Sequence, residues 1–271
     1  MQRRLDMLPA PAVRELAKRE GSTVIWPFGA VEQHGPHLPL GTDGLFAERV
    51  LDGALAGLPE QLAVARLPLQ PIGFSPEHSG FAGSLSLPAD LIIQMVVAVG
   101  LNLAEAGFQR LVLFNGHGGQ IGLLQVASRQ LRLARPSLAV LPCFLWSGPE
   151  QVWELIPEPE RSQGLHAGQA ETSLMLHLAP ELVGPERPAD GLQGPPIPAG
   201  WSLEGQAPCA WLTGDISRSG VIGDAGAASA ALGAELEKRL VAGWQRRFSS
   251  LLNSPWPAPG AAIGSQTEGG G

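Results

Sequence analysis

The sequence predicts an α/β protein with a mostly parallel central sheet and helices on both faces. Two observations favour this fold class. Short apolar runs alternate with longer stretches of helical period, the pattern of parallel strands joined by crossover helices. The chain has 271 residues, the upper end of what one α/β domain holds. We therefore expect a single domain over residues 1–253, and we expect residues 254–271 to form a disordered C-terminal tail.

Four short apolar runs are predicted to be the strands of the sheet. Each is rich in leucine, valine or isoleucine, and polar or turn-forming residues follow most of them. They are residues 22–28, 62–72, 110–114 and 138–145.

Longer segments of helical period lie between and after these runs. Helices are predicted at residues 44–57, 89–106, about 119–134 and roughly 225–249. Pro88 and Gly107 suit the two ends of the second helix. The segments 148–164 and 184–214 are rich in proline, glycine and charge, and we expect them to be lids or subunit contacts rather than core.

The overall charge and composition favour a small-molecule partner. The net charge is −7 and the sequence pI is about 5.4, with no basic patch of the kind that binds nucleic acid. No apolar run reaches the length of a membrane span, and the N-terminus has no signal-peptide core, so we expect a cytoplasmic protein. Cys143 and Cys209 lie far apart, outside any thiolate metal motif, and are expected to be buried.

The stretch GAVEQHGPHLPLGTD, residues 29–43, follows the first strand and is dense in metal-ligand types. Glu32 and His34 leave an extended chain on one face, and glycines and prolines then turn the chain back to Asp43. Mixed oxygen and nitrogen ligands suit Zn²⁺, Mn²⁺ or Fe²⁺ better than Ca²⁺ or Mg²⁺. A structural alternative, equally supported by this stretch alone, is that Thr42 or Asp43 only caps the next helix.

A second polar stretch, LVLFNGHGGQ at residues 111–120, places His117 at the carboxyl end of a strand. In open α/β sheets ligands bind at that end, and Gly118 and Gly119 allow a ligand to approach the backbone closely. A glycine-rich turn before a helix can also bind phosphate, but the lysine of a P-loop is missing. An ordinary tight turn with an incidental histidine is the remaining alternative.

Two further stretches carry candidate residues. His166 precedes an amphipathic helix that contains Glu171 and ends by Pro180, although a glutamate in a first helical turn needs no function. His177 should face away from Glu171 and is taken as structural. After the second strand, three side chains could contact substrate or support the ligands: Ser75, Glu77 and His78. No GxSxG motif is present, which makes a serine hydrolase a weak alternative.

Taken together, these stretches resemble the creatininase family of metal-dependent amidohydrolases. The matching segments occur in the family's order and are PFGAVEQHGPHLPLGTD (27–43), GFSPEH (73–78), GSLSL (83–87), FNGHGGQ (114–120), HAGQAETS (166–173) and GVIGDA (220–225). The resemblance implies a creatininase-like three-layer α/β/α sandwich, a homohexamer and a binuclear metal centre.

The resemblance also implies roles for individual residues. Glu32, His34, Asp43 and His117 match metal ligands, with Asp43 between two divalent ions, for which Zn²⁺ is preferred over Mn²⁺ and Fe²⁺. Creatininase takes its last carboxylate ligand from the position of Gly119, so here Glu171 is expected to replace it. His166 matches the catalytic histidine that protonates the departing nitrogen.

The resemblance favours an amidohydrolase that cleaves the C–N bond of a small cyclic amide or formamide by means of a metal-activated bridging water. Creatinine itself is disfavoured because Gly118, Gly119 and Leu165 depart from creatininase. The substrate is expected to contact Ser75, Glu77, His78, Gly118 and Gly119. A peptidase that acts on a short modified precursor peptide and a non-catalytic small-molecule or metal-binding relative are the two alternatives.

Overall fold

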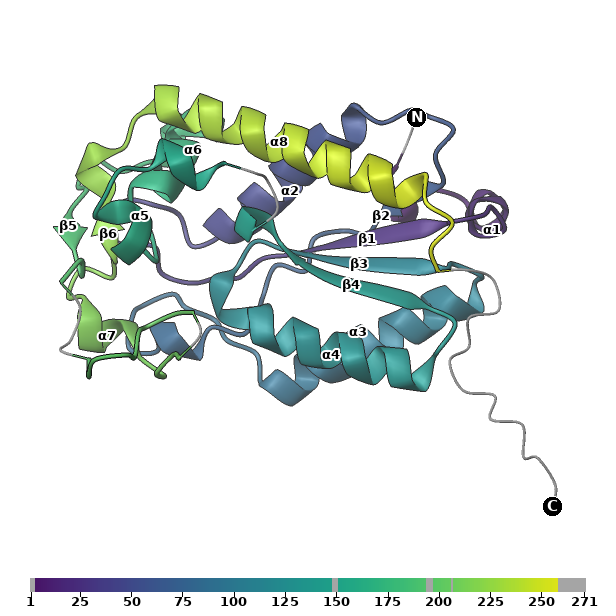
Figure 1. Ribbon diagram of the computed structural model, residues 1–271, viewed down its shortest axis with the longest axis horizontal. Helices are drawn as coiled ribbons and strands as arrows, with labels where there is room; N and C mark the ends of the chain where they lie inside the picture. The colour runs from purple at the N-terminus through teal and green to yellow at the C-terminus, as the bar shows by residue number, and fades with distance from the viewer. Residues whose placement is uncertain (1–2, 148–150, 194–196, 206, 258–271) are drawn as a thin grey trace, which may run out of the picture.

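The computed structural model describes residues 3–147, 151–193, 197–205 and 207–257. It confirms the α/β fold class: four parallel strands form a central sheet in the order β2-β1-β3-β4 (Figure 1). The strands are β1 (Thr23–Phe28), β2 (Val64–Arg66), β3 (Arg110–Asn115) and β4 (Ala139–Phe144). No helix among the described residues is both long and apolar enough to cross a lipid bilayer.

Helices cover both faces of the sheet, which gives three layers (Figure 1). On one face lie α2 (Thr42–Ala56), α6 (Gln169–Leu178) and α8 (Ala230–Leu252). On the other lie α3 (Ala89–Glu105) and α4 (Ile121–Ala134), with α1 (Ala10–Ala17) near the amino ends of the strands.

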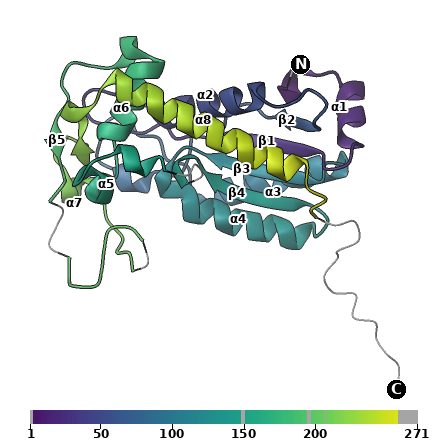
Figure 2. The ribbon, with the colours of Figure 1, turned by 45° about the horizontal axis from the view of Figure 1, so that its top comes forward.

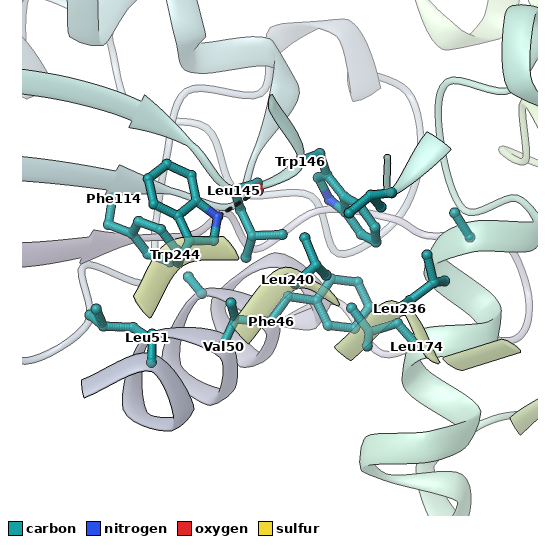
Figure 3. Packing of buried hydrophobic residues seen from close by; sticks show 14 of the residues in the cluster. Phe46, Val50, Leu51, Phe114, Leu145, Trp146, Leu174, Leu236, Leu240 and Trp244 are labelled. Carbon is teal, nitrogen blue, oxygen red and sulfur yellow. Dashed lines mark hydrogen bonds between the residues drawn. The ribbon is translucent and has the colours of Figure 1, made fainter. Parts of the chain in front are cut away.

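Side chains of the strands alternate between two apolar cores. Ile25 and Val112 point to the core under α2, α6 and α8, whereas Val24 and Leu111 point to the core under α3 and α4. In the first core the aromatic rings of Phe46 and Trp146 meet edge to face, with centroids 6.1 Å apart (Figure 3). The inner strands β1 and β3 are therefore buried on both faces, which explains why they read as continuous apolar runs.

Two expected elements have different bounds in the structure. The strand predicted at 62–72 is only three residues long, because Pro68 and Pro71 have no N–H to donate to a neighbouring strand. The final helix begins at Ala230 rather than at 225, since the Ser229 hydroxyl accepts a hydrogen bond from the Leu232 N–H and caps the helix there. Most of the predicted C-terminal tail, from residue 258 on, lies outside the described residues.

The described segments between β4 and α8, apart from α6, gather beyond one end of the sheet (Figure 2). They contain α5 (Glu160–Gln163), α7 (Thr213–Ile216) and an antiparallel pair, β5 (Ala189–Asp190) with β6 (Gly223–Asp224). His166 forms a backbone bridge with Ile222. These segments therefore lie next to the carboxyl ends of the strands, where a ligand site is expected.

Candidate metal centre

The site lies between the carboxyl ends of β1 and β3. The chain after β1 returns through α2 to β2 on one side, and β3 pairs with β1 on the other side, so the strand order reverses at this point. Such a reversal leaves a crevice beyond the strand ends. Glu32 and His34 enter it from the loop after β1, and His117 enters it from the turn after β3.

Close backbone approach brings Asp43 into the same crevice. A Cβ at Gly29 would lie 2.5 Å from the Cα of Gly44, and one at Gly116 would collide with the carbonyl oxygen of Asp43. Only glycines permit this contact between two strand ends and the start of α2. Neither Thr42 nor Asp43 caps α2, whose N-cap is Gly41 with no side-chain hydrogen bond, so the capping interpretation is wrong.

Two side chains that the sequence analysis did not single out hold His117 in place. The Asn115 carboxamide accepts a hydrogen bond from the His117 N–H (3.0 Å) and donates one to its carbonyl (2.6 Å). Gln120 Nε2 donates to Asn115 Oδ1 and to the carbonyl of Gly29, which ties the turn after β3 to the end of β1. An asparagine before a glycine at a strand end is a known turn signature and could have indicated this role.

Three histidines direct one ring nitrogen to a backbone carbonyl and the other into the crevice. His34 Nδ1 donates to Glu32 O (3.1 Å), His117 Nε2 to Phe74 O (3.0 Å), and His166 Nε2 to Gln33 O (2.7 Å). A carbonyl accepts but never donates, so each of these nitrogens carries the proton. The other ring nitrogen of each histidine therefore faces the carboxylates, which is the orientation that metal-binding histidines show. These nitrogens are His34 Nε2, His117 Nδ1 and His166 Nδ1.

Glu32 and Asp43 lie among these nitrogens. Glu32 Oε1 is 3.2 Å from His117 Nδ1 and 3.9 Å from His166 Nδ1. Asp43 reaches both sides, with Oδ1 3.3 Å from His34 Nε2 and Oδ2 3.4 Å from His117 Nδ1. Asp43 thus occupies the central position between two groups of ligand-type atoms.

Glu171, in the first turn of α6, joins the group on the His34 side. Ligand atoms of His34, Asp43 and Glu171 all lie within 4.8 Å of one another. The other Glu171 oxygen, Oε2, accepts a hydrogen bond from the Ala167 N–H (2.6 Å). Burial raises the pKa of Glu171 to about 7, although the positive charge of His34 acts against this shift.

The polar atoms of the crevice have unmet bonding needs that a divalent metal would satisfy. Among the buried side-chain atoms without a hydrogen-bond partner are both carboxylate oxygens of Glu32, Asp43 Oδ2 and His34 Nε2. Each buried polar atom left unpaired costs about 1–3 kcal/mol. Burial lowers the pKa of His34, but nearby Asp43 outweighs this effect and raises it to about 9, so a proton holds the place that a metal would take.

The residues expected to contact substrate differ in how deeply they are buried. Gly118 and Gly119 are exposed at its mouth, and a Cβ on Gly118 would meet nothing within 4 Å. Ser75 and His78 are buried deeper, and Glu77 Oε1 lies 3.2 Å from His117 Nε2. A Cβ at Gly119 would overlap the Glu77 carboxylate, so the glycine at 119 makes room for Glu77.

The other histidines and the cysteines lie elsewhere. His177 contacts Glu237 of α8 at 2.8 Å, and His37 Nε2 bonds the Thr172 hydroxyl at 2.7 Å. Cys143 and Cys209 are free and half-buried, rather than fully buried as expected.

Comparisons with known proteins show which family the chain resembles. A family model described as "Creatininase: Creatinine amidohydrolase" matches residues 6–248. The chain is 32% identical over 259 residues to the mycofactocin precursor peptide peptidase of Mycobacterium tuberculosis, which covers 90% of this chain and 94% of that protein. It is also 32% identical over 178 residues to the creatinine amidohydrolase of Pseudomonas putida, across 60% of this chain and 67% of that protein.

A solved structure titled "Creatininase Mn" superposes with a TM-score of 0.76 at 23% identity, over 94% of this chain and 100% of that one. At this level of identity the likeness shows the shared fold, a three-layer sandwich around a mostly parallel sheet.

Proposed function

The chain belongs to the creatininase family of metal-dependent hydrolases, and from this premise we propose that it cleaves the amide C–N bond of a short peptide. The hydrolase assignment rests on five ligand-type side chains that meet beyond β1 and β3 and that include buried polar atoms without a hydrogen-bond partner. These side chains are Glu32, His34, Asp43, His117 and Glu171.

We propose two divalent ions, with Zn²⁺ preferred and Mn²⁺ or Fe²⁺ as alternatives. Glu32 and His117 would hold one, His34 and Glu171 the other, and Asp43 would contribute an oxygen to each. This assignment gives Glu171 the role that the sequence analysis expected for it, in place of the carboxylate missing at Gly119. Bound there, such ions polarise a substrate carbonyl and activate a water molecule near neutral pH.

His166 is proposed to move the proton that the reaction requires. Its Nε2–H is committed to the Gln33 carbonyl, which leaves the lone pair of Nδ1 facing Glu32 and the crevice. Burial, with the positive charge of neighbouring His34, holds the pKa of His166 well below its ordinary value, so the resting imidazole is neutral. Nδ1 can therefore accept a proton as water adds to the amide carbon and pass it to the departing nitrogen.

Two observations support a peptide over a small cyclic amide as the substrate. The M. tuberculosis relative aligned over 90% of this chain is named as a peptidase. Gly118 is exposed and a Cβ there would meet nothing within 4 Å, so the chain beside His117 leaves room for a longer substrate. A small cyclic amide or formamide, the first expectation from the sequence, remains the second candidate because of the similarity to the P. putida creatinine amidohydrolase.

Metal analysis followed by a substrate panel tests the proposal. Purified protein supplemented with Zn²⁺ or Mn²⁺ would be analysed for bound metal and then incubated with short peptides, creatinine, other cyclic amides and formamides. We expect about two ions per chain and cleavage of at least one peptide. Glu171→Gln should bind zinc more weakly and lose activity, whereas Glu181→Gln, an exposed site in the turn after α6, is the matched control.

The possible results separate the candidates. Turnover of cyclic amides without peptides would transfer the assignment to the second candidate. Full metal occupancy without turnover of any substrate in the panel would favour the non-catalytic relative. Metal-free protein after supplementation would contradict the hydrolase proposal altogether.

A further inference from the structure

A fourth histidine, His78, borders the same crevice but differs from the other three. It is 2% exposed and lies in the short 3-10 turn Pro76–His78. Its Nε2 is 3.3 Å from Glu32 Oε1, and its ring centroid is 4.2 Å from that of His166. By position alone His78 could be a metal ligand, a substrate contact or a support for Glu32.

The hydrogen bonds of Gln33 decide which nitrogen of His78 carries the proton. Gln33 Oε1 accepts from the backbone N–H of Gly35 (2.9 Å), and Gln33 Nε2 donates to the backbone carbonyl of Gly220 (3.0 Å). A backbone N–H only donates and a carbonyl only accepts, so these two partners fix the orientation of the Gln33 carboxamide. The nitrogen of that carboxamide is 2.9 Å from His78 Nδ1.

An amide nitrogen is a donor only, so His78 Nδ1 must accept. Thr213, the first residue of α7, places its hydroxyl 2.8 Å from the same nitrogen and can donate to it as well. With Nδ1 as acceptor, the neutral ring carries its proton on Nε2. The N–H of His78 therefore points toward Glu32. His34, His117 and His166 differ because they direct an N–H to a backbone carbonyl, so the nitrogen that faces the crevice is the one that a metal would bind.

We propose that His78 is a positioning residue for the candidate ligand Glu32: it presents Nε2–H to the Glu32 carboxylate and is not itself a metal ligand. This inference rests on the proposed metal site. An N–H directed at a carboxylate restricts its orientation toward the metal, as the outer partners of metal ligands commonly do. Gln33 and Thr213 set the proton position, so the segment that carries α7 is coupled to the metal site through His78.

The tautomer can be observed directly in the unmodified protein. Nuclear magnetic resonance of ¹⁵N-histidine-labelled protein distinguishes a protonated from an unprotonated ring nitrogen, and the chain has six histidines. The His78 signals are assigned by their absence from His78→Gln. We expect a protonated Nε2 and an unprotonated Nδ1 both without metal and with Zn²⁺. A protonated Nδ1, or an Nε2 that loses its proton on Zn²⁺ addition, would overturn the proposal.

Two substitutions provide an independent readout, zinc affinity in competition with a chelator. His78→Leu removes the N–H donor and should weaken zinc binding about 10- to 100-fold, the range known for outer partners of ligands. His78→Gln retains an N–H donor near Nε2 and should recover a large part of that loss. Equal loss in both variants would indicate a ligand and refute the positioning role.

His177→Gln is the matched control for losing an imidazole outside the site, and its affinity should equal that of the wild type. Failure of this inference is distinguishable from failure of the proposed function. The tautomer and the zinc affinities are measured without substrate, whereas the function is decided by turnover.

Discussion

Zinc binding should release protons, and Glu171→Gln should change their number by a defined amount. The pKa of His34 is raised to about 9 and that of Glu171 to about 7 in the metal-free protein. At pH 7 His34 is therefore protonated and Glu171 about half protonated, so zinc binding at this pair should release about 1.5 protons. The variant retains only the His34 contribution of about 1 proton.

The same pKa values give the direction and size of the pH dependence. Both groups are raised, so protons compete with zinc at low pH and the affinity rises with pH. Displacing a proton from a group with pKa 9 costs about 2.7 kcal/mol at pH 7, a factor of about 100 in affinity. Between pH 6 and pH 8, titration of both groups should raise the zinc affinity about 1,000-fold, and titration of His34 alone about 100-fold.

Isothermal titration calorimetry in buffers of different ionisation enthalpy measures the number of protons released. Protons released at His117 add equally to both proteins, so the difference between wild type and Glu171→Gln reports the loss of the Glu171 carboxylate, including its smaller effect on the pKa of His34. We expect the wild type to release about 0.5 proton more than the variant at pH 7. Between pH 6 and pH 8 the zinc affinity of the wild type should rise by a factor about tenfold larger than that of the variant. Identical proton release and identical pH slopes in the two proteins would show that Glu171 does not bind the metal.

Three further predictions concern the support of the site and the fold. Glu77→Gln removes the negative charge beside His117 Nε2, and zinc affinity should fall about tenfold in a chelator competition; an unchanged affinity would exclude this role. Phe46→Ala empties a fully buried position against Trp146 and should lower the free energy of unfolding by about 3–5 kcal/mol in denaturant titrations, whereas a loss below about 1 kcal/mol would contradict the packing described. Partial burial raises the pKa of Asp190, but hydrogen bonds from Ser219 and Ser217 outweigh it and lower the pKa from 3.8 to about 2. Asp190 therefore stabilises the fold above pH 4 and loses this effect as the pH falls toward 2. Asp190→Asn should lower the free energy of unfolding by about 1 kcal/mol at pH 6 and by much less near pH 2, as measured by denaturant unfolding at both pH values.

Most of the fold could be predicted from local sequence patterns. The apolar runs that became β1 and β3 are buried on both faces, and such strands leave a clear pattern because every position faces a core. The run that became β4 was also recognised, although β4 is an edge strand that is only partly buried. The second strand was overestimated because apolar residues continue past Arg66, whereas pairing depends on backbone N–H groups that the prolines lack.

The candidate site was predicted less completely. Ligand-type residues stood out because they directly follow strands, where parallel sheets place ligands. Gln33 and Thr213 gave no such indication, since their importance lies in partners far away in the chain: Gly220 and His78.

The sequence by itself determined the fold class and the position of the site at the strand ends, because these follow from local apolar pattern and residue type. The set of candidate ligands, Glu171 included, came from the resemblance of its motifs to the creatininase family. Only the tertiary structure decided that Glu171 stands beside His34 and Asp43, and that His78 Nε2 lies 3.3 Å from Glu32 Oε1. The physical reason is that both outcomes depend on hydrogen bonds and backbone approaches between segments more than 100 residues apart.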